Sequence, residues 1–416
     1  MDDAVDMHKS HFIPMPRHEV KKRLFAEPQV APLIEEGLES VCTMLEALDH
    51  HSSLSELERL KVLYCAMDPD SESQIEIAEV DSFISAFEEV LVDGNWEHVT
   101  DEEFQLAMDG ESLFPISMDV RLDEFVTMKL YKLGRDEMTE NLPNTLDNLL
   151  GRPGKEIKFE MYNRVIQIIH FKDSKWFMEQ GRKKHDPGKI GEGLHLRLFK
   201  NVPVEDLEII FPNTTPKMRP MDKAKISLPL VIGLVMLFQQ YLLPIIVGGP
   251  TADLSQALLV ALASALGSYA MKAYMTYRKT KETYMAAVAK DLYFKGQANN
   301  QAVLNMVIDL AEEQEVKESL LCYTFLLAEA DVGHTLASLD ARIEAWLAEQ
   351  GVHADFEIRD AIGDLAEMGL MELTGDVRSD DGSWNMDVPL GHIAVPIKES
   401  LARLDDIWDG LYNFEH

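Results

Sequence analysis

The stretch LPLVIGLVMLFQQYLLPIIVGGPTADLSQALLVALASALGSYA, Leu228–Ala270, decides how the rest of this sequence is interpreted. Two apolar arms, about 226–247 and 254–271, flank a turn-forming corner that includes Gly248, Gly249 and Pro250. Each arm is close to the ~20 residues with which a helix crosses ~30 Å of hydrocarbon. The sequence therefore predicts a transmembrane helical hairpin, and a buried hairpin inside a large domain is the alternative.

Basic residues flank the two arms on both sides. Lys223 and Lys225 precede the first arm, and Lys272, Arg278 and Lys279 follow the second. Because basic flanks stay on the cytoplasmic side of a membrane, this pattern predicts both chain termini in the cytoplasm.

The arms themselves contain a few polar and small residues. Gln239 and Gln240 are costly in lipid unless they hydrogen-bond to another helix. Ala261, Ala265 and Gly267 would let helices approach closely. Packing within the hairpin is one interpretation, and a homo-oligomer with the glutamines along a polar path, such as a channel, is the other.

The composition limits the classes of partner. With 72 acidic and 39 basic residues among 416, the formal charge is −33, which repels nucleic-acid phosphate, so no nucleic-acid partner is expected. Three scattered cysteines imply neither a disulfide framework nor a zinc site. The segment MDDAVDMHKSHFIPMP lacks the pattern of a targeting peptide, which predicts a first domain in the cytoplasm.

One acidic segment, DPDSESQIEIAE, has partial calcium-loop spacing. Asp68, Asp70, Glu72 and Glu79 fall at loop positions 1, 3, 5 and 12, but Ser73 stands where the sharp turn needs glycine. An acidic helix-capping turn is the favoured interpretation, so these residues form a weak calcium candidate and no metal site is expected.

The pattern on either side of the hairpin predicts a mainly helical α+β fold. Amphipathic periodicity dominates before residue 150, and alternation with β-branched residues follows in EIKFEMYNRVIQIIHFK and LHLRLFKNV. The predicted regions are an N-terminal helical domain (1–150), a small β-rich region (151–224), the transmembrane hairpin (225–273), a helical rod with amphipathic helices (274–330) and a winged-helix-like domain (331–416).

Signatures of catalysis are absent from the sequence. The carboxylates Asp309, Glu312, Glu313 and Glu315 lack Glu-x-x-His partners, so a solvated face paired with Lys317 is the favoured interpretation. Without an assignable nucleophile, base or cofactor motif, the sequence predicts neither a catalytic residue nor a cofactor. The protein is expected not to be an enzyme, and a membrane-bound hydrolase is an alternative without assigned residues.

The C-terminal region has the order helix, helix, strand, acidic loop, strand, helix. Its candidate recognition helix, DFEIRDAIGDLAEM, has Arg359 as its single basic residue among five acidic ones. Because DNA would be repelled, this domain is predicted to dock a protein partner.

The segments FKNVPVEDLEIIFPNTTPKMRPMDKAKISLP and LYFKGQANNQAVLNMVIDLAEEQEVKESLLCYTFLL resemble the family known as domain of unknown function 3754. The resemblance, of a transmembrane protein 143-like kind, extends from FIPMPR through YCAMDPD to LDDIWDGLYNF. It implies a two-helix membrane protein and supplies no reaction or ligand. Together these patterns predict an integral protein of a bacterial cytoplasmic membrane that acts as a scaffold or interaction protein, with the lipid bilayer and further copies of itself as partners.

Overall fold

The computed structural model describes residues 10–71, 80–109, 117–142, 155–217, 256–373, 377–378, 383–390 and 393–411, with single helical residues at 228, 231–232, 235 and 239. The chain divides into two compact units. Unit 1 comprises residues 1–99, 124–202 and 297–416, and unit 2 comprises residues 100–123 and 203–296.

Unit 1 combines a helical layer with a five-stranded sheet. The sheet has the order β1-β3-β4-β5-β7, and β3 pairs antiparallel with both β1 and β4. Its strands are β1 (Glu97–His98), β3 (Phe125–Leu142), β4 (Lys155–Phe171), β5 (Leu194–Pro203) and β7 (Gly296–Asn299). Its helices are α1 (Arg17–Leu24), α2 (Ala31–Glu36), α3 (Leu38–Tyr64), α4 (Val80–Asp93), α7 (Ser174–Glu179), α11 (Gln301–Ala328), α12 (Leu336–Glu349), α13 (Ile358–Glu367) and α14 (Ile397–Gly410), with short 3-10 turns η2 (Gly188–Gly191) and η5 (Ala330–Val332).

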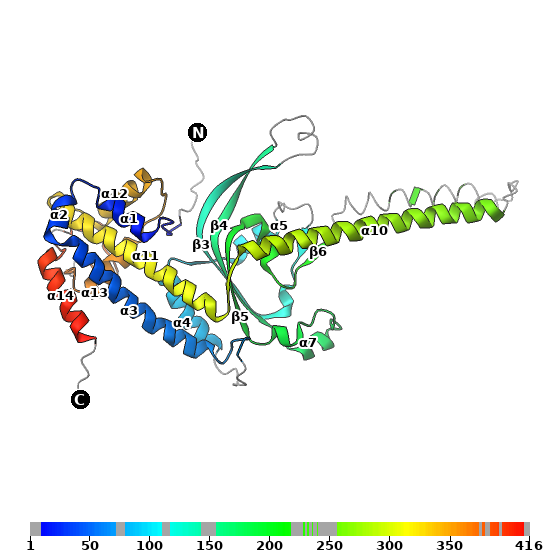
Figure 1. Cartoon of the computed structure of the whole chain (residues 1–416), viewed down its shortest axis with the longest axis horizontal. Coiled ribbons are helices and arrows are strands. Elements are labelled where there is room, and N and C mark those ends of the chain that lie inside the picture. The colour runs from blue at the N-terminus through cyan, green and yellow to red at the C-terminus, as the bar shows by residue number, and fades with distance from the viewer. Residues whose placement is uncertain are drawn as a thin grey trace. The chain divides into compact units, whose positions relative to one another are not determined.

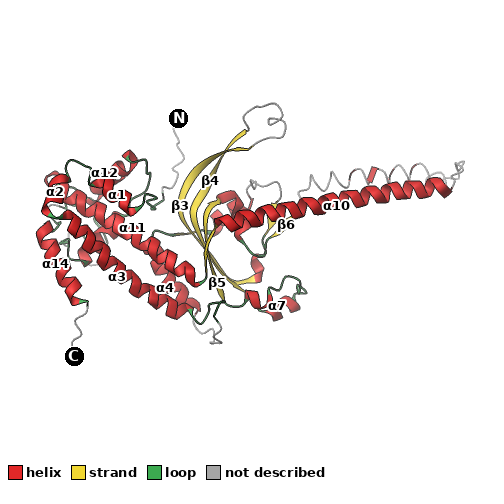
Figure 2. Ribbon diagram, in the orientation of Figure 1, coloured by secondary structure: helices red, strands yellow, loops and turns green. Residues whose placement is uncertain are grey.

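The β3–β4 ladder is the longest in the sheet, as Figure 2 shows in yellow. It runs from the pair Phe125↔Phe171 to the pair Leu142↔Lys155, with an irregularity between Phe125 and Thr127. Residues 125–142 lie in the region expected to be helical, yet they form a strand. The reason is that β4, whose run Val165–Ile169 is buried, supplies a continuous pairing edge.

Helix α11 is central to unit 1. It packs against α3, α4, α12 and α13, and Figure 1 shows it running beside α3. Two apolar cores meet it: one includes Leu320, Tyr323 and Phe325 with the C-terminal helices, and the other includes Val303 and Leu304 with the sheet. Because neighbours surround its second half, α11 is buried on nearly every side from Val316 to Leu326.

The C-terminal part of unit 1 follows α11 with α12, α13 and α14, joined by short β-bridges. Thr335 bridges to Pro389 and Met371 bridges to Ala394. The two predicted strands are present only as isolated bridges among the described residues, and the winged-helix-like fold of this region stays a prediction.

Unit 2 contains a small two-stranded ladder and one long helix. Its elements are α5 (Asp101–Asp109), β2 (Ser117–Asp119), β6 (Thr215–Lys217), the 3-10 segment η3 (Val204–Ile210) and α10 (Gln256–Lys295), while η1 (Leu122–Glu124) spans its boundary with unit 1. Strands β2 and β6 pair antiparallel, and Met118, Ile209 and Val288 share a core.

The predicted transmembrane hairpin is wrong on this structure. Among the described residues, no helix is both long and apolar enough to cross a membrane. The second arm forms the start of α10. The stretch from Gln256, where the helix begins, to the basic Lys272 contains fewer than the ~20 residues that a membrane span needs. Polar Ser264 and Ser268 interrupt this part, and the helix then continues through basic residues to Lys295.

Several further predictions depended on that hairpin and are corrected with it. These are the transmembrane part of the fold class, the function as an integral membrane scaffold, the alternative function as a channel with a polar path near Gln239 and Gln240, and the location in a bacterial cytoplasmic membrane with both termini in the cytoplasm. Most of the first arm, with the corner Gly248–Pro250, lies outside the described residues.

Candidate functional site

A cavity of about 390 Å³ lies in unit 1 where α2, the end of α11 and the start of α14 meet. We call it the α2–α14 pocket. Apolar side chains form most of its wall, and a single carboxylate is among them. The lining residues are Leu33, Glu36, Leu326, Leu327, Ala330, Ala394, Pro396 and Ile397.

Gly37 determines how this wall is built. It ends α2 and begins α3 with φ of 115°, a left-handed conformation that L side chains rarely adopt. A Cβ at this position would lie 3.5 Å from Leu401 Cδ1 and 3.6 Å from Ile397 Cγ2. The turn therefore places Leu33 and Glu36 of α2 beside the first turn of α14.

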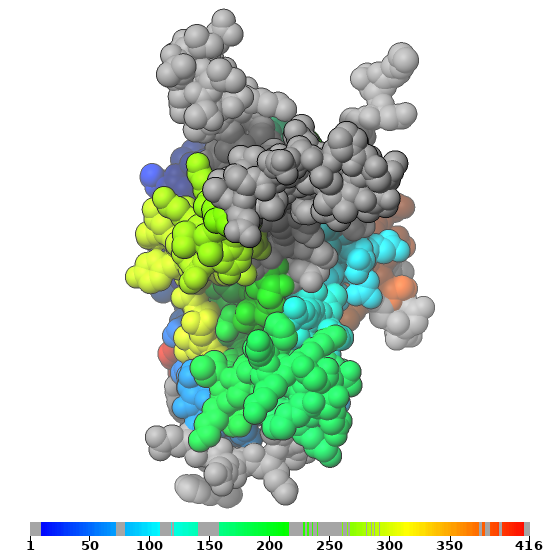
Figure 3. Space-filling model, turned by 90° about the vertical axis from the view of Figure 1, so that its right-hand side faces the viewer, coloured from blue at the N-terminus to red at the C-terminus, as the bar shows by residue number. Residues whose placement is uncertain are grey.

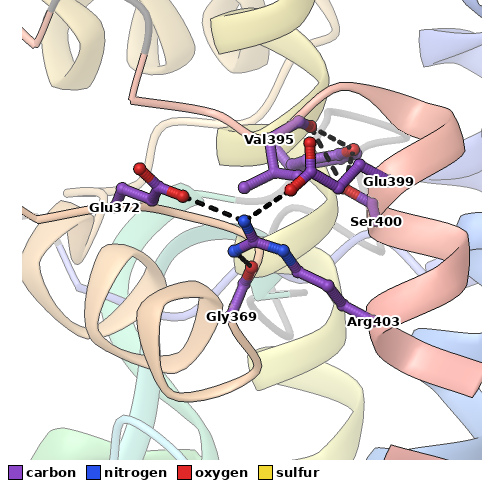
Figure 4. A network of polar contacts seen from close by, with 7 residues as sticks. Gly369, Glu372, Val395, Glu399, Ser400 and Arg403 are labelled. Atoms are coloured by element: carbon purple, nitrogen blue, oxygen red, sulfur yellow. Dashed lines mark hydrogen bonds and ion pairs between the residues drawn. The ribbon is translucent and has the colours of Figure 1, made fainter. Parts of the chain in front are cut away.

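Polar contacts hold α14 in place, as Figure 4 shows. The Arg403 guanidinium donates to the carbonyl of Gly369 at 2.6 Å and pairs with Glu372 and Glu399. The buried Ser400 hydroxyl donates to the carbonyl of Val395 at 3.1 Å.

Helix α11 adds a second attachment through the buried Tyr323. Its hydroxyl lies 2.8 Å from Ser400 Oγ and 3.0 Å from the carbonyl oxygen of Val395. Since Val395 directly precedes the lining residues Pro396 and Ile397, this contact fixes one wall of the α2–α14 pocket.

The charges around the pocket are mostly negative. Glu36 is exposed at its edge, and Glu35 and Glu39 are exposed beside it in the chain. Lys398, which follows Ile397, is exposed on the other side. An apolar cavity with a carboxylate edge suits an apolar group that has positive charges next to it.

The weak calcium candidate has only two described members. Asp68 Oδ1 accepts from the backbone N–H of Asp70 at 3.0 Å, and Asp70 Oδ2 accepts from Asn300 Nδ2 at 2.7 Å. Both carboxylates thus have contacts within the protein. Glu72 and Glu79 lie outside the described residues. Across the described residues, no group of three or more His, Cys, Asp or Glu side chains is arranged to hold a metal ion.

The structure describes only some of the residues predicted for the membrane hairpin. Gln239 and Gly267 are exposed, and the backbones of Ala261 and Ala265 lie in α10. Lys272, Arg278 and Lys279 are exposed on α10, where Arg278 pairs with Glu282 at 2.8 Å. Lys223, Lys225, Gln240, Gly248, Gly249 and Pro250 lie outside the described residues.

A larger hollow, of about 810 Å³, runs along α10. Among the described residues, its lining runs from Ser264 to Lys279 on α10.

The carboxylates of α11 form only part of the solvated face that the sequence predicts. Asp309 is exposed and Glu313 and Glu315 are half-buried, whereas Glu312 and the expected partner Lys317 are buried. The Lys317 ammonium donates to the backbone carbonyls of Ile13 and Met15, at 2.7 and 3.3 Å, instead of pairing with a neighbouring carboxylate. Burial lowers its pKa to about 8.

Two carboxyl groups, one on α11 and one on α13, have strongly raised pKa values. Burial raises the pKa of Glu315 on α11 to about 8, and the charges of Asp49 and Asp364 add to this rise. Burial also raises the pKa of Asp364 on α13 to about 7, again with Asp49 contributing. The acidic residues of α13 therefore face acidic residues of α3 and α11.

Residues 162–302 match the family described as Protein of unknown function (DUF3754). The predicted family is therefore confirmed over this segment, which extends from β4 to the start of α11. The transmembrane protein 143-like detail stays a prediction. No solved structure matches this chain.

The α2–α14 pocket was not predicted from the sequence. Leu33 and Glu36 belong to a helix of six residues, which is too short to show a periodic pattern. The available signal was Gly37, which follows an apolar and acidic run and marks a sharp change of chain direction.

Proposed function

We propose that this chain is a protein-docking module and not an enzyme, and that its α2–α14 pocket receives an apolar side chain of a partner protein. The observation that carries the proposal is the cavity of about 390 Å³ with apolar walls and Glu36 at its edge. Buried apolar anchors in such pockets dominate the energetics of protein–protein contacts.

The chemistry of the partner follows from charge. The formal charge of the chain is −33, and Glu35, Glu36 and Glu39 are exposed together near the pocket. A partner segment with lysine or arginine on either side of its apolar anchor would gain favourable electrostatic contacts and faster association. Nucleic acid is not proposed as a partner, since its phosphates would be repelled.

Support also comes from the way the pocket is held. Arg403, Tyr323 and Ser400 fix α14, so the wall formed by Pro396 and Ile397 is already ordered before a partner arrives. A preformed pocket avoids part of the entropic cost of ordering on binding.

Fluorescence anisotropy tests this proposal. The probe is a labelled peptide with one isoleucine between two pairs of lysines, and the same peptide with alanine in place of isoleucine measures the role of the anchor. We expect the isoleucine peptide to bind the full-length chain, and Ala330→Phe or Glu36→Lys to raise its Kd by about tenfold or more, since each blocks one recognition element.

Matched controls lie on α12. Ala348→Phe and Glu349→Lys make the same changes at exposed positions outside the pocket lining. They should leave Kd unchanged, and melting temperatures should confirm that every variant is folded. Equal Kd values for the parent chain, Ala330→Phe and Glu36→Lys would refute docking at this pocket.

A further inference from the structure

One segment of unit 1 has a net positive charge although the chain as a whole is acidic, a property that it shares with α1 and with residues 272–295 of α10. Residues 172–190, which we call the basic lobe, contain six lysine and arginine side chains and three acidic ones, in a protein with a large acidic excess. Its basic residues are Lys172, Lys175, Arg182, Lys183, Lys184 and Lys189.

The lobe is an ordered structure built around Trp176. Asp173 caps α7 by accepting from the backbone N–H of Trp176 at 2.9 Å. The Lys172 ammonium lies 4.5 Å from the centre of the Trp176 ring, and the Arg182 guanidinium lies 5.6 Å from it. The space-filling view shows this segment in green as a broad rounded surface (Figure 3).

Apolar side chains stand exposed among these charges. Ile190 is 83% exposed and Met178 is 59% exposed. Lys189 directly precedes Ile190 and is also exposed, and Lys183 and Lys184 are exposed in the preceding turn. The lobe therefore presents an unburied aliphatic anchor with neighbouring positive charges.

We propose that the basic lobe of one copy docks in the α2–α14 pocket of a second copy, with Ile190 as the apolar anchor. The proposal rests on the docking function proposed above and names its partner. The two surfaces are complementary in apolar character and in charge. The lobe has an exposed aliphatic side chain with neighbouring lysines, and the pocket is an apolar cavity with Glu36 at its edge and further exposed acidic residues beside it.

The contact has to form between copies. Within unit 1, α7 lies at the opposite end from α2 and α14 in Figure 1. Because lobe and pocket are different surfaces, two copies pair either reciprocally about a two-fold axis or head to tail, and head-to-tail contacts build rings or open chains of subunits.

Mixing variants of the full-length chain gives a sharp test. Ile190→Asp removes the anchor from the lobe and leaves the pocket intact, while Ala330→Phe blocks the pocket and leaves the lobe intact. By sedimentation velocity, we expect the parent chain to self-associate and each variant alone to be monomeric. A mixture of the two should form a complex of one copy each, because one functional interface remains.

Val62→Asp provides the control for the anchor substitution, since Val62 is 75% exposed on α3. This variant should associate like the parent chain. A monomeric parent chain, or association that persists in Ile190→Asp, would overturn the proposed pairing. So would a mixture that stays monomeric.

The peptide experiment separates this proposal from the one on which it rests. If the lysine–isoleucine peptide binds the pocket but the chain stays monomeric, docking stands and the second copy is excluded as partner. If the peptide does not bind and Ile190→Asp still associates, both proposals fail.

Discussion

Gly37 is the residue whose conformation matters most for the α2–α14 pocket. Its φ of 115° is unfavourable for an L side chain, although an added Cβ would lie at ordinary contact distance from its neighbours. We therefore expect Gly37→Ala to lower the free energy of unfolding by about 1–2 kcal/mol, through backbone strain and not through a clash. Urea denaturation followed by circular dichroism measures this change.

Gly363→Ala is the matched control, because Gly363 lies within α13 and a Cβ there would meet nothing within 4 Å. In a helix interior this change should raise stability by roughly 0.5–1 kcal/mol. If both variants were equally stable, backbone strain at Gly37 would not be the cause.

The second prediction at the scale of a residue concerns the buried hydroxyl of Tyr323. Tyr323→Phe keeps the ring in the core and removes the contacts of the hydroxyl with Ser400 and Val395. Because Ser400 Oγ still contacts the carbonyl of Val395, the loss should be about 1 kcal/mol. Thermal unfolding in Tyr323→Phe, Ser400→Ala and the double variant would measure it, and additive losses would contradict a shared network.

Helices α11 and α13 share an apolar core, and the interaction between Glu315 and Asp364 beside it makes their packing depend on pH. Burial raises the pKa of Glu315 to about 8 and that of Asp364 to about 7, so the folded chain binds more protons than the unfolded chain between about pH 4 and 8. Stability therefore falls as pH rises through this window and levels off above it.

Glu315→Gln and Asp364→Asn should each make the free energy of unfolding depend less on pH. Their stabilising effect, relative to the parent chain, should be larger at pH 8 than at pH 5. Hydrogen exchange of α13 measures the effect locally. Glu349→Gln, at an exposed position of α12, is the control and should leave the pH profile unchanged. An identical slope in all variants would show that other groups take up the protons.

Individual elements differ in how far their sequence predicts them. Strand β4 could be predicted because VIQIIHF is β-branched and apolar, which suits a strand buried on both faces. Strand β3 could not, since its Met, Leu, Lys, Arg and Glu residues also favour helices, and its state is set by pairing with β4.

The same limit applies to side chains. A charged stretch such as Asp309–Lys317 is typical of a solvated helix face, and nothing local shows that Ile13 and Met15 will cover Lys317. The α2–α14 pocket shares this property, because its walls come from segments as far apart as Leu33 and Ile397.

For the whole molecule, the apolar stretch Leu228–Ala270 dominated the prediction and led to the wrong fold class. Hydropathy averaged over two arms treats each as an independent span, whereas the second arm is continuous with the polar remainder of α10. The charge excess was the more useful global property, because net basic segments such as the basic lobe stand out against an acidic chain.

The last prediction concerns how salt affects self-association. Two copies with a formal charge of −33 each repel at long range, while the basic lobe and the acidic pocket edge attract at contact. At about 0.01 M salt the Debye length is ~30 Å and the repulsion extends over the whole approach, whereas at about 0.15 M it is ~8 Å and mainly contact pairs remain. Association should therefore be strongest at intermediate salt and weaken again near 1 M, where the Debye length of ~3 Å screens the contact pairs as well.

Sedimentation velocity across this salt series measures the strength of association. The variant Lys183→Glu/Lys184→Glu should lose the maximum at intermediate salt, and Lys279→Glu on α10 is the control that should keep this maximum. A steady decline from the lowest salt upward would mean that repulsion between whole copies does not oppose the docking of lobe and pocket.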